Sequence, residues 1–95
     1  MATPEAKTKA AVRKILETSG AYFFMPVSNG MGRHGIPDVI ACKNGHFFGI
    51  ECKAGKGKTT ALQDRELLNI TNTGGTALII NEHNLDELKK ALDEH

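Results

Sequence analysis

The sequence predicts an α/β domain with the element order αβββαβα, in which helices flank a mixed sheet. Three observations lead to this prediction. Apolar residues recur at helical spacing in several segments. Asn44-Gly45 separates two runs rich in β-formers, which is typical of a two-residue hairpin. Gly74-Gly75 punctuates the second half of the chain. Three helices and about four strands fit best into one sheet with helices on its faces.

Length and composition limit what the protein can be. At 95 residues, residues 1–95 are expected to form a single domain, since chains divide into separate cores only at larger sizes. A hydrophobic content of 40% and a charged content of 24% are those of an ordinary globular protein. The net charge is only +1, so any nucleic-acid binding must come from local clusters of Lys and Arg. No segment approaches the roughly 20 apolar residues of a membrane span. An intracellular, cytoplasmic protein without a membrane partner is therefore expected.

The first helix is predicted from Pro4 to Thr18. Thr3 supplies an N-cap, and proline suits the first helical position. The β-rich segment from Ala21 to Val27 is predicted to be the first strand, with Pro26 near an edge or bulge. Residues Ser28 to Gly35 contain three glycines and are expected to form a loop that can bring backbone close to a ligand.

The hairpin is predicted from the strands Asp38 to Cys42 and His46 to Lys53. A two-residue turn at Asn44-Gly45 places Lys43 opposite His46, and counting outward pairs Asp38 with Glu51. A three-residue turn would shift this register and separate the two carboxylates.

The second half of the chain is predicted to be helix, strand and helix. Thr60-x-x-Gln63 resembles a capping box that opens a helix reaching about Asn72. Thr76 to Ile80 has the length and composition of a strand. A capping box of Asn84 and Glu87 is expected to start the last helix, whose apolar stripe is Leu85, Leu88 and Leu92.

The paired carboxylates are the main candidate for chemistry. In the predicted register the Cβ atoms of Asp38 and Glu51 lie about 5 Å apart, where like charges repel unless something compensates them. Lys53 projects from the same face. The hairpin is otherwise apolar on both faces, so the sheet is expected to be covered on both sides. Mg²⁺, bound by two carboxylates, water and a substrate phosphate, would compensate the buried charge. A structural ion pair between Lys53 and Glu51 is the alternative.

The cysteines offer no competing chemistry. The same register puts Cys42 and Cys52 on opposite faces of the sheet, which excludes a disulfide between them. Reduced thiols that pack as small hydrophobic residues are expected. The two cysteines and four histidines also lack the spacing of zinc ligands.

The motifs Gly35-Ile36-Pro37-Asp38 and Glu51-Cys52-Lys53-Ala54-Gly55, followed by Gln63, resemble the virus-type replication-repair nuclease (VRR-NUC) family of the PD-(D/E)xK superfamily. The resemblance extends from the first helix through the strand after Gly74-Gly75. It implies a restriction-endonuclease-like core and a Mg²⁺- or Mn²⁺-dependent endonuclease that hydrolyses DNA. Stand-alone members resemble homodimeric Holliday-junction resolvases, so branched DNA is the implied substrate.

The resemblance also implies roles for individual residues. Asp38, Glu51 and the backbone carbonyl of Cys52 would bind the metal, and Lys53 would be catalytic. Cys52 stands where the family usually has an apolar residue, which matters little for a position that contributes backbone. Gln63 either closes the capping box with Thr60 or reaches the active site, and the family match favours the second role.

Other residues are candidates with clear alternatives. Glu5 lies on the apolar stripe of the first helix and is a possible metal ligand, although an acid in a first helical turn is favourable in any case. His34 is left without a role. Four basic residues suit contacts to DNA phosphates, with solvated loop charges as the alternative: Arg33, Lys56, Lys58 and Arg65.

The sequence offers two competing interpretations. Gly57-Lys58-Thr59 is not a P-loop, because that motif needs a glycine where Cys52 stands. A non-catalytic DNA-binding or assembly module with a nuclease-like fold is the serious alternative. Loss of the acidic residues or the lysine would indicate it, and none of them is lost.

Overall fold

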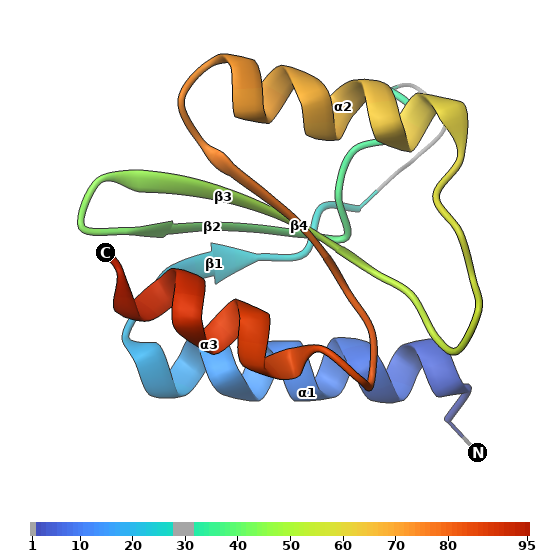
Figure 1. Ribbon diagram of the computed structural model, residues 1–95, viewed down its shortest axis with the longest axis horizontal. Coiled ribbons are helices and arrows are strands. Elements are labelled where there is room, and N and C mark those ends of the chain that lie inside the picture. Colours follow the sequence, from blue (N-terminus) through green and yellow to red (C-terminus); the bar gives the residue numbers. More distant parts are fainter. Residues whose placement is uncertain (1, 28–31) are drawn as a thin grey trace.

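The computed structural model describes residues 2–27 and 32–95, so part of the predicted glycine-rich loop lies outside the described residues. The chain forms three layers (Figure 1). Helices α1 (Pro4–Ser19) and α3 (Leu85–Asp93) lie on one face of the sheet, and α2 (Ala61–Asn72) lies on the other. The strands are β1 (Tyr22–Phe24), β2 (Val39–Lys43), β3 (His46–Cys52) and β4 (Thr76–Ile80). The predicted order αβββαβα is confirmed. None of these helices could cross a membrane.

The sheet is mixed, with the strand order β1-β2-β3-β4. The first two pairings are antiparallel and β3 pairs with β4 in parallel. The hairpin register places Lys43 opposite His46 and Ile40 opposite Gly49, as predicted. Asn44 and Gly45 have φ angles of 51° and 81°, the left-handed values that a type I′ turn requires. The two-residue turn is therefore confirmed, and with it the face on which each side chain of the hairpin lies.

The main core lies between the sheet and the layer formed by α1 and α3. Cys52 belongs to this core and Cys42 lies on the opposite face, so both thiols are free. Leu88 and Leu92 are buried in the same core, which shows that the stripe of the last helix packs inside the chain. The other fully buried members are Val12, Leu16, Val39, Ala41, Phe48, Ile50 and Ile80.

Helices lie on both faces of the sheet, as predicted, but they cover the second face only in part. Helix α2 lies over β3 and β4, where a Cβ on Gly49 would come within 2.4 Å of Ile70 Cδ1. Within residues 2–27 and 32–95, no helix lies over β1 and β2 on this face. Tyr22 is 72% exposed, Phe24 48% and Phe47 43%. The apolar residues of the hairpin predicted that both faces of the sheet are buried. Their pattern could not show that α2 alone does not extend over all four strands.

Several element ends differ from the sequence-based predictions by one residue, and two differences are larger. Strand β1 ends at Phe24 instead of Val27, just before Pro26, which has no backbone N–H to pair. Asn84 does precede α3, but its side chain makes no capping hydrogen bond. Instead Asn84 Oδ1 accepts from the N–H of Asn81, and Nδ2 donates to the Ile79 carbonyl at 2.9 Å. The predicted capping box at this helix is therefore wrong.

Gly35 is required where the chain passes under the start of α2. Its φ angle is 80°, and a Cβ there would lie 2.6 Å from the backbone carbonyl of Leu62. No side chain fits this contact, because the obstacle is helix backbone. The close approach ties the segment before Asp38 to α2.

We predict that Gly35→Ala destabilises the fold more than Gly20→Ala. Both glycines have a φ angle of 80°, but a Cβ on Gly20 meets nothing within 4 Å. Gly20→Ala should cost about 1–2 kcal/mol for the left-handed backbone alone. Gly35→Ala adds the clash with α2. Urea unfolding of both variants measures the difference, and equal losses would contradict the close approach.

Candidate active site

Asp38 and Glu51 come together at the end of the sheet where β2 begins and β3 ends. Val39 pairs with Ile50 at this end of the hairpin. Asp38 directly precedes Val39 and Glu51 directly follows Ile50, so continuing the register by one pair brings Asp38 opposite Glu51. Its Oδ2 accepts a hydrogen bond of 2.9 Å from the N–H of Cys52. The N-terminal ends of α1 and α2 lie at the same end of the molecule (Figure 1). The sheet and both helices can therefore contribute to one site.

Glu51 is the most buried charged group of the chain's described part, with 2% of its surface exposed. Its Oε2 has two partners, Lys53 Nζ and Gln63 Nε2. Its Oε1 is buried and has no hydrogen-bond partner among the described residues. Burial, reinforced by the neighbouring charge of Asp38, raises the pKa of Glu51 to about 7, although Lys53 opposes the shift. A positively charged group beside Glu51 Oε1 would therefore stabilise the charged carboxylate.

Gln63 both closes the capping box with Thr60 and reaches Glu51. Its Oε1 accepts from the N–H of Thr60 at 2.9 Å and closes the capping box at the start of α2. Because the oxygen is used there, the amide nitrogen points inward and donates to Glu51 Oε2 at 2.8 Å. The capping box thus orients the side chain that holds Glu51.

Lys53 lies beside Glu51 on the same face. Its Nζ is 3.4 Å from Glu51 Oε2, and the side chain is 15% exposed. The ion pair that formed the structural alternative therefore exists. A partly exposed ammonium at the rim of a buried carboxylate can also reach a substrate, so the ion pair does not exclude a catalytic role.

Helix α1 contributes a residue that the sequence analysis missed. Lys9 Nζ is 3.7 Å from Asp38 Oδ1. Glu5 lies one helical turn earlier and is half-buried, and its charge contributes to raising the pKa of the Cys52 thiol, which burial chiefly raises to about 12. Glu5 therefore faces the site from α1. The spacing of Glu5 and Lys9, four residues apart on one helix, was the available signal.

The donor set fits a hard divalent cation. In an extended strand the N–H and C=O of one residue point the same way. The N–H of Cys52 points to Asp38, so its carbonyl faces that side as well. Two carboxylates and a carbonyl are oxygen ligands suited to Mg²⁺, and Glu51 Oε1 lacks a partner. No cluster of three or more His, Cys, Asp or Glu side chains that could hold a metal occurs in residues 2–27 and 32–95. Water and phosphate would have to complete the coordination.

The four basic candidates are all exposed but differ in their contacts. Arg33 and Arg65 approach Glu66, a buried acid of α2 that the sequence analysis did not single out. Lys56 and Lys58 lie in the loop after β3. His34 is exposed as well.

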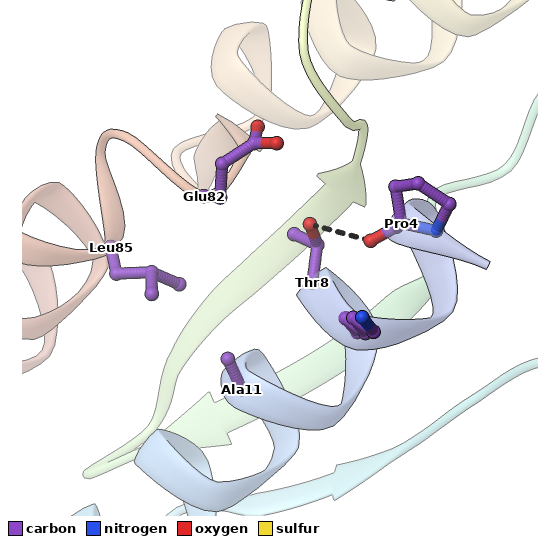
Figure 2. Close-up of a pocket in the computed structure, with 6 residues that line it drawn as sticks. Pro4, Thr8, Ala11, Glu82 and Leu85 are labelled. Carbon is purple, nitrogen blue, oxygen red and sulfur yellow. Dashed lines mark hydrogen bonds between the residues drawn. The ribbon is translucent and has the colours of Figure 1, made fainter. Parts of the chain in front are cut away.

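The loop after β3 is fixed by another acid that the sequence did not indicate. Glu82 Oε1 accepts from the N–H of Gly55 at 2.8 Å, which lowers the pKa of Glu82. Glu82 also borders a hollow of about 180 Å³ between α1 and the start of α3 (Figure 2). The hydroxyl of Thr8 in this hollow already donates to the Pro4 carbonyl. None of the carboxylates of the candidate site lines the hollow, so we place the site at Asp38 and Glu51.

Comparisons with known proteins agree with this geometry. A solved structure described as a VRR_NUC domain superposes with a TM-score of 0.70. It shares 18% sequence identity, and the alignment covers 98% of this chain and 94% of the other. The fold is thus the VRR_NUC nuclease fold, as the motifs predicted. No curated protein matches the chain.

The sequence model of the archaeal Holliday junction resolvase (Hjc) family matches residues 6–90. The chain belongs to this family, a group of PD-(D/E)xK nucleases. The matched range includes Asp38, Glu51 and Lys53.

We predict that the metal-free protein loses stability as pH rises from about 4.5 to about 7. The pKa of Glu51 is raised on folding, so the folded state binds the proton more tightly than the unfolded state. Its stabilising contribution is complete below the unfolded pKa and is lost as pH rises through the folded pKa. Glu51→Gln should flatten this dependence in thermal unfolding, and at pH 8 it should be more stable than the wild type by on the order of 1 kcal/mol. An unchanged pH profile in Glu51→Gln would contradict the assignment.

Proposed function

We propose that the protein is a Mg²⁺- or Mn²⁺-dependent endonuclease that hydrolyses phosphodiester bonds in branched DNA such as Holliday junctions. The carrying observation is the buried pair Asp38 and Glu51, with an unpartnered Glu51 oxygen and Lys53 beside it. Membership of a family described as Holliday junction resolvases supports the choice of substrate. Retention of both acids and the lysine argues against the non-catalytic alternative.

The residues divide the work according to their positions. Asp38, Glu51 and the carbonyl of Cys52 would hold the cation, with Glu5 as a possible further ligand from α1. A bound divalent cation neutralises charge on the phosphate and lowers the pKa of water. Gln63 fixes one Glu51 oxygen and leaves the other facing the site.

Lys53 would act on the attacking water or on the charge that builds up at phosphorus. Its ammonium lies next to the carboxylate pair, so it needs no rearrangement to face a phosphate bound there. Arg33, Lys56, Lys58 and Arg65 would contact the DNA backbone, because all four are exposed basic residues.

We predict that cleavage of a four-way junction requires a divalent cation and that Asp38→Ala and Glu51→Ala reduce it to the level seen in excess chelator. Lys53→Ala should fold and bind metal but lose at least about 100-fold in rate, as is usual when transition-state charge loses a partner. Lys14→Ala, an exposed lysine of α1, is the control and should cleave normally. Gel assays on branched and linear DNA measure the rates. Full activity of either acid variant would reject the site, and junction binding without any cleavage would support the non-catalytic alternative.

A homodimer is the assembly that we propose for this function. A four-way junction needs cuts on two strands, and two-fold assembly is the commonest closed symmetry. The apolar stripe of α3 does not serve as the contact, because Leu88 and Leu92 are buried in the core. The uncovered half of the sheet, with Tyr22, Phe24 and Phe47, supports a partner there. It offers roughly 300 Å² of aromatic surface, enough for the centre of an interface of about 800 Å² per subunit.

We predict that light scattering at micromolar concentration gives the mass of a dimer. Combined Tyr22→Ser and Phe24→Ser substitutions should shift the protein to a monomer that still folds, because within the chain Tyr22 is 72% exposed and Phe24 48% exposed. Leu68→Ser, at an exposed leucine on the far side of α2, is the control and should leave the mass unchanged. A wild-type monomer would reject the dimer while leaving the nuclease chemistry intact.

A further inference from the structure

Glu66 is a buried acid that the proposed chemistry does not use. It is 7% exposed and lies on α2, three residues after Gln63. Arg33 Nε lies 2.8 Å from its Oε1, and Arg65 Nε lies 3.6 Å from its Oε2. A buried carboxylate destabilises a fold unless positive groups compensate it. The two arginines provide this compensation, and they come from different segments of the chain.

The contacts leave both guanidinium groups able to bind something else. Each arginine approaches Glu66 through Nε, so the four N–H groups on Nη1 and Nη2 are not needed for the ion pair. The side chains of Arg33 and Arg65 remain 63% and 53% exposed. The outer edge of a guanidinium is a planar fork that matches two oxygens of a phosphate. Glu66 thus holds the guanidinium groups of Arg33 and Arg65 beside one carboxylate.

Glu66 itself remains incompletely satisfied. Its Oε2 is buried and has no hydrogen bond among the described residues, because Arg65 stops at 3.6 Å. Two arginines brought together repel each other, and one carboxylate between them cancels only one of their two charges. An anion between the outward forks would balance the cluster.

We propose that Glu66 positions Arg33 and Arg65 as one binding site for a backbone phosphate of the DNA. This inference rests on the proposed DNA substrate and deepens it. Glu66 is a positioning residue, because it acts through the arginines and is itself too buried to meet the DNA. Helix α2 then serves the substrate twice, with Gln63 holding Glu51 and Glu66 holding the phosphate site.

If only net charge mattered, removing Glu66 would strengthen DNA binding, whereas loss of its positioning role would weaken it. An acid near a phosphate backbone repels it, so its loss should strengthen DNA binding. If Glu66 orients the arginines, its loss should weaken binding although the protein becomes more positive. The sign of the change therefore separates positioning from a bystander charge.

The test is binding of a four-way junction in excess chelator, measured against salt concentration for Glu66→Met and Glu66→Gln. Methionine fills the buried position without charge, and the two arginines that lose their partner are 63% and 53% exposed, so no unpaired charge is left buried. Each phosphate contact contributes a slope of about 0.9 to the fall of log binding constant with log salt concentration, which is about eightfold between 0.1 M and 1 M salt. Glu66→Met should therefore weaken binding at 0.1 M salt by up to about eightfold per lost contact. The salt slope should fall by about 1 per lost contact. Glu66→Gln, which can still accept from Arg33, should lose less.

Control variants separate positioning from folding and from net charge. Asp86→Asn removes a 99% exposed acid on α3 and should not weaken binding. Arg33→Lys keeps the charge but loses the fork, so it should recover only part of the loss caused by Arg33→Ala. In the Arg33→Ala, Arg65→Ala background, Glu66→Met should cause no further loss. With saturating metal and varied junction concentration, Glu66→Met should raise the KM for DNA and leave kcat nearly unchanged.

Binding by Glu66→Met that is as tight as that of the wild type, with an unchanged salt slope, would overturn the proposal and leave Glu66 a structural ion pair. A further loss in the background without the two arginines would also overturn it. A wild type that binds no DNA would reject the proposed function itself and this inference with it. Normal binding without cleavage would reject only the nuclease chemistry.

Discussion

Burial of the Glu51 carboxylate at the end of β3 is the constraint on which the rest of the site depends. The strand is covered on both faces at this point, so the charge is removed from water and the pKa rises to about 7. One oxygen is held by Lys53 and Gln63, and the other is left without a partner. A structural ion pair alone would not need that second oxygen turned away from its partners. The arrangement is unfavourable for an empty protein and favourable for one that binds a cation.

Helix α2 gives this constraint its geometry. Its capping box fixes Gln63, and the capped amide turns its nitrogen toward Glu51. The backbone of the same helical turn packs against Gly35, which positions the segment leading to Asp38. One turn further on, Glu66 reaches Arg33. A single amphipathic helix thus contacts Glu51, the segment that leads to Asp38 and the arginine Arg33.

Because α2 is the single helix on its face of the sheet among the described residues, that face is covered only in part. Helices α1 and α3 bury their face of the sheet, but α2 covers only β3 and β4. Tyr22 and Phe24 are left exposed on β1. A contiguous patch of exposed apolar side chains is typical of a surface that contacts another molecule. This open face, beside the short β1 strand, is the surface on which we propose that a second subunit binds.

The sequence by itself determined the hairpin, its register and the opposition of Asp38 and Glu51, because a two-residue turn leaves one way to count outward and side chains alternate between faces. It also determined the capped start of α2, since those contacts are local. Only the tertiary structure decided what meets across the chain. Lys9 reaches Asp38, Glu66 joins Arg33 to Arg65, and Glu82 holds Gly55. The uncovered half of the sheet is likewise a matter of how far one helix extends over four strands. Such contacts depend on the relative placement of distant elements, and neither period nor spacing in a sequence encodes that directly.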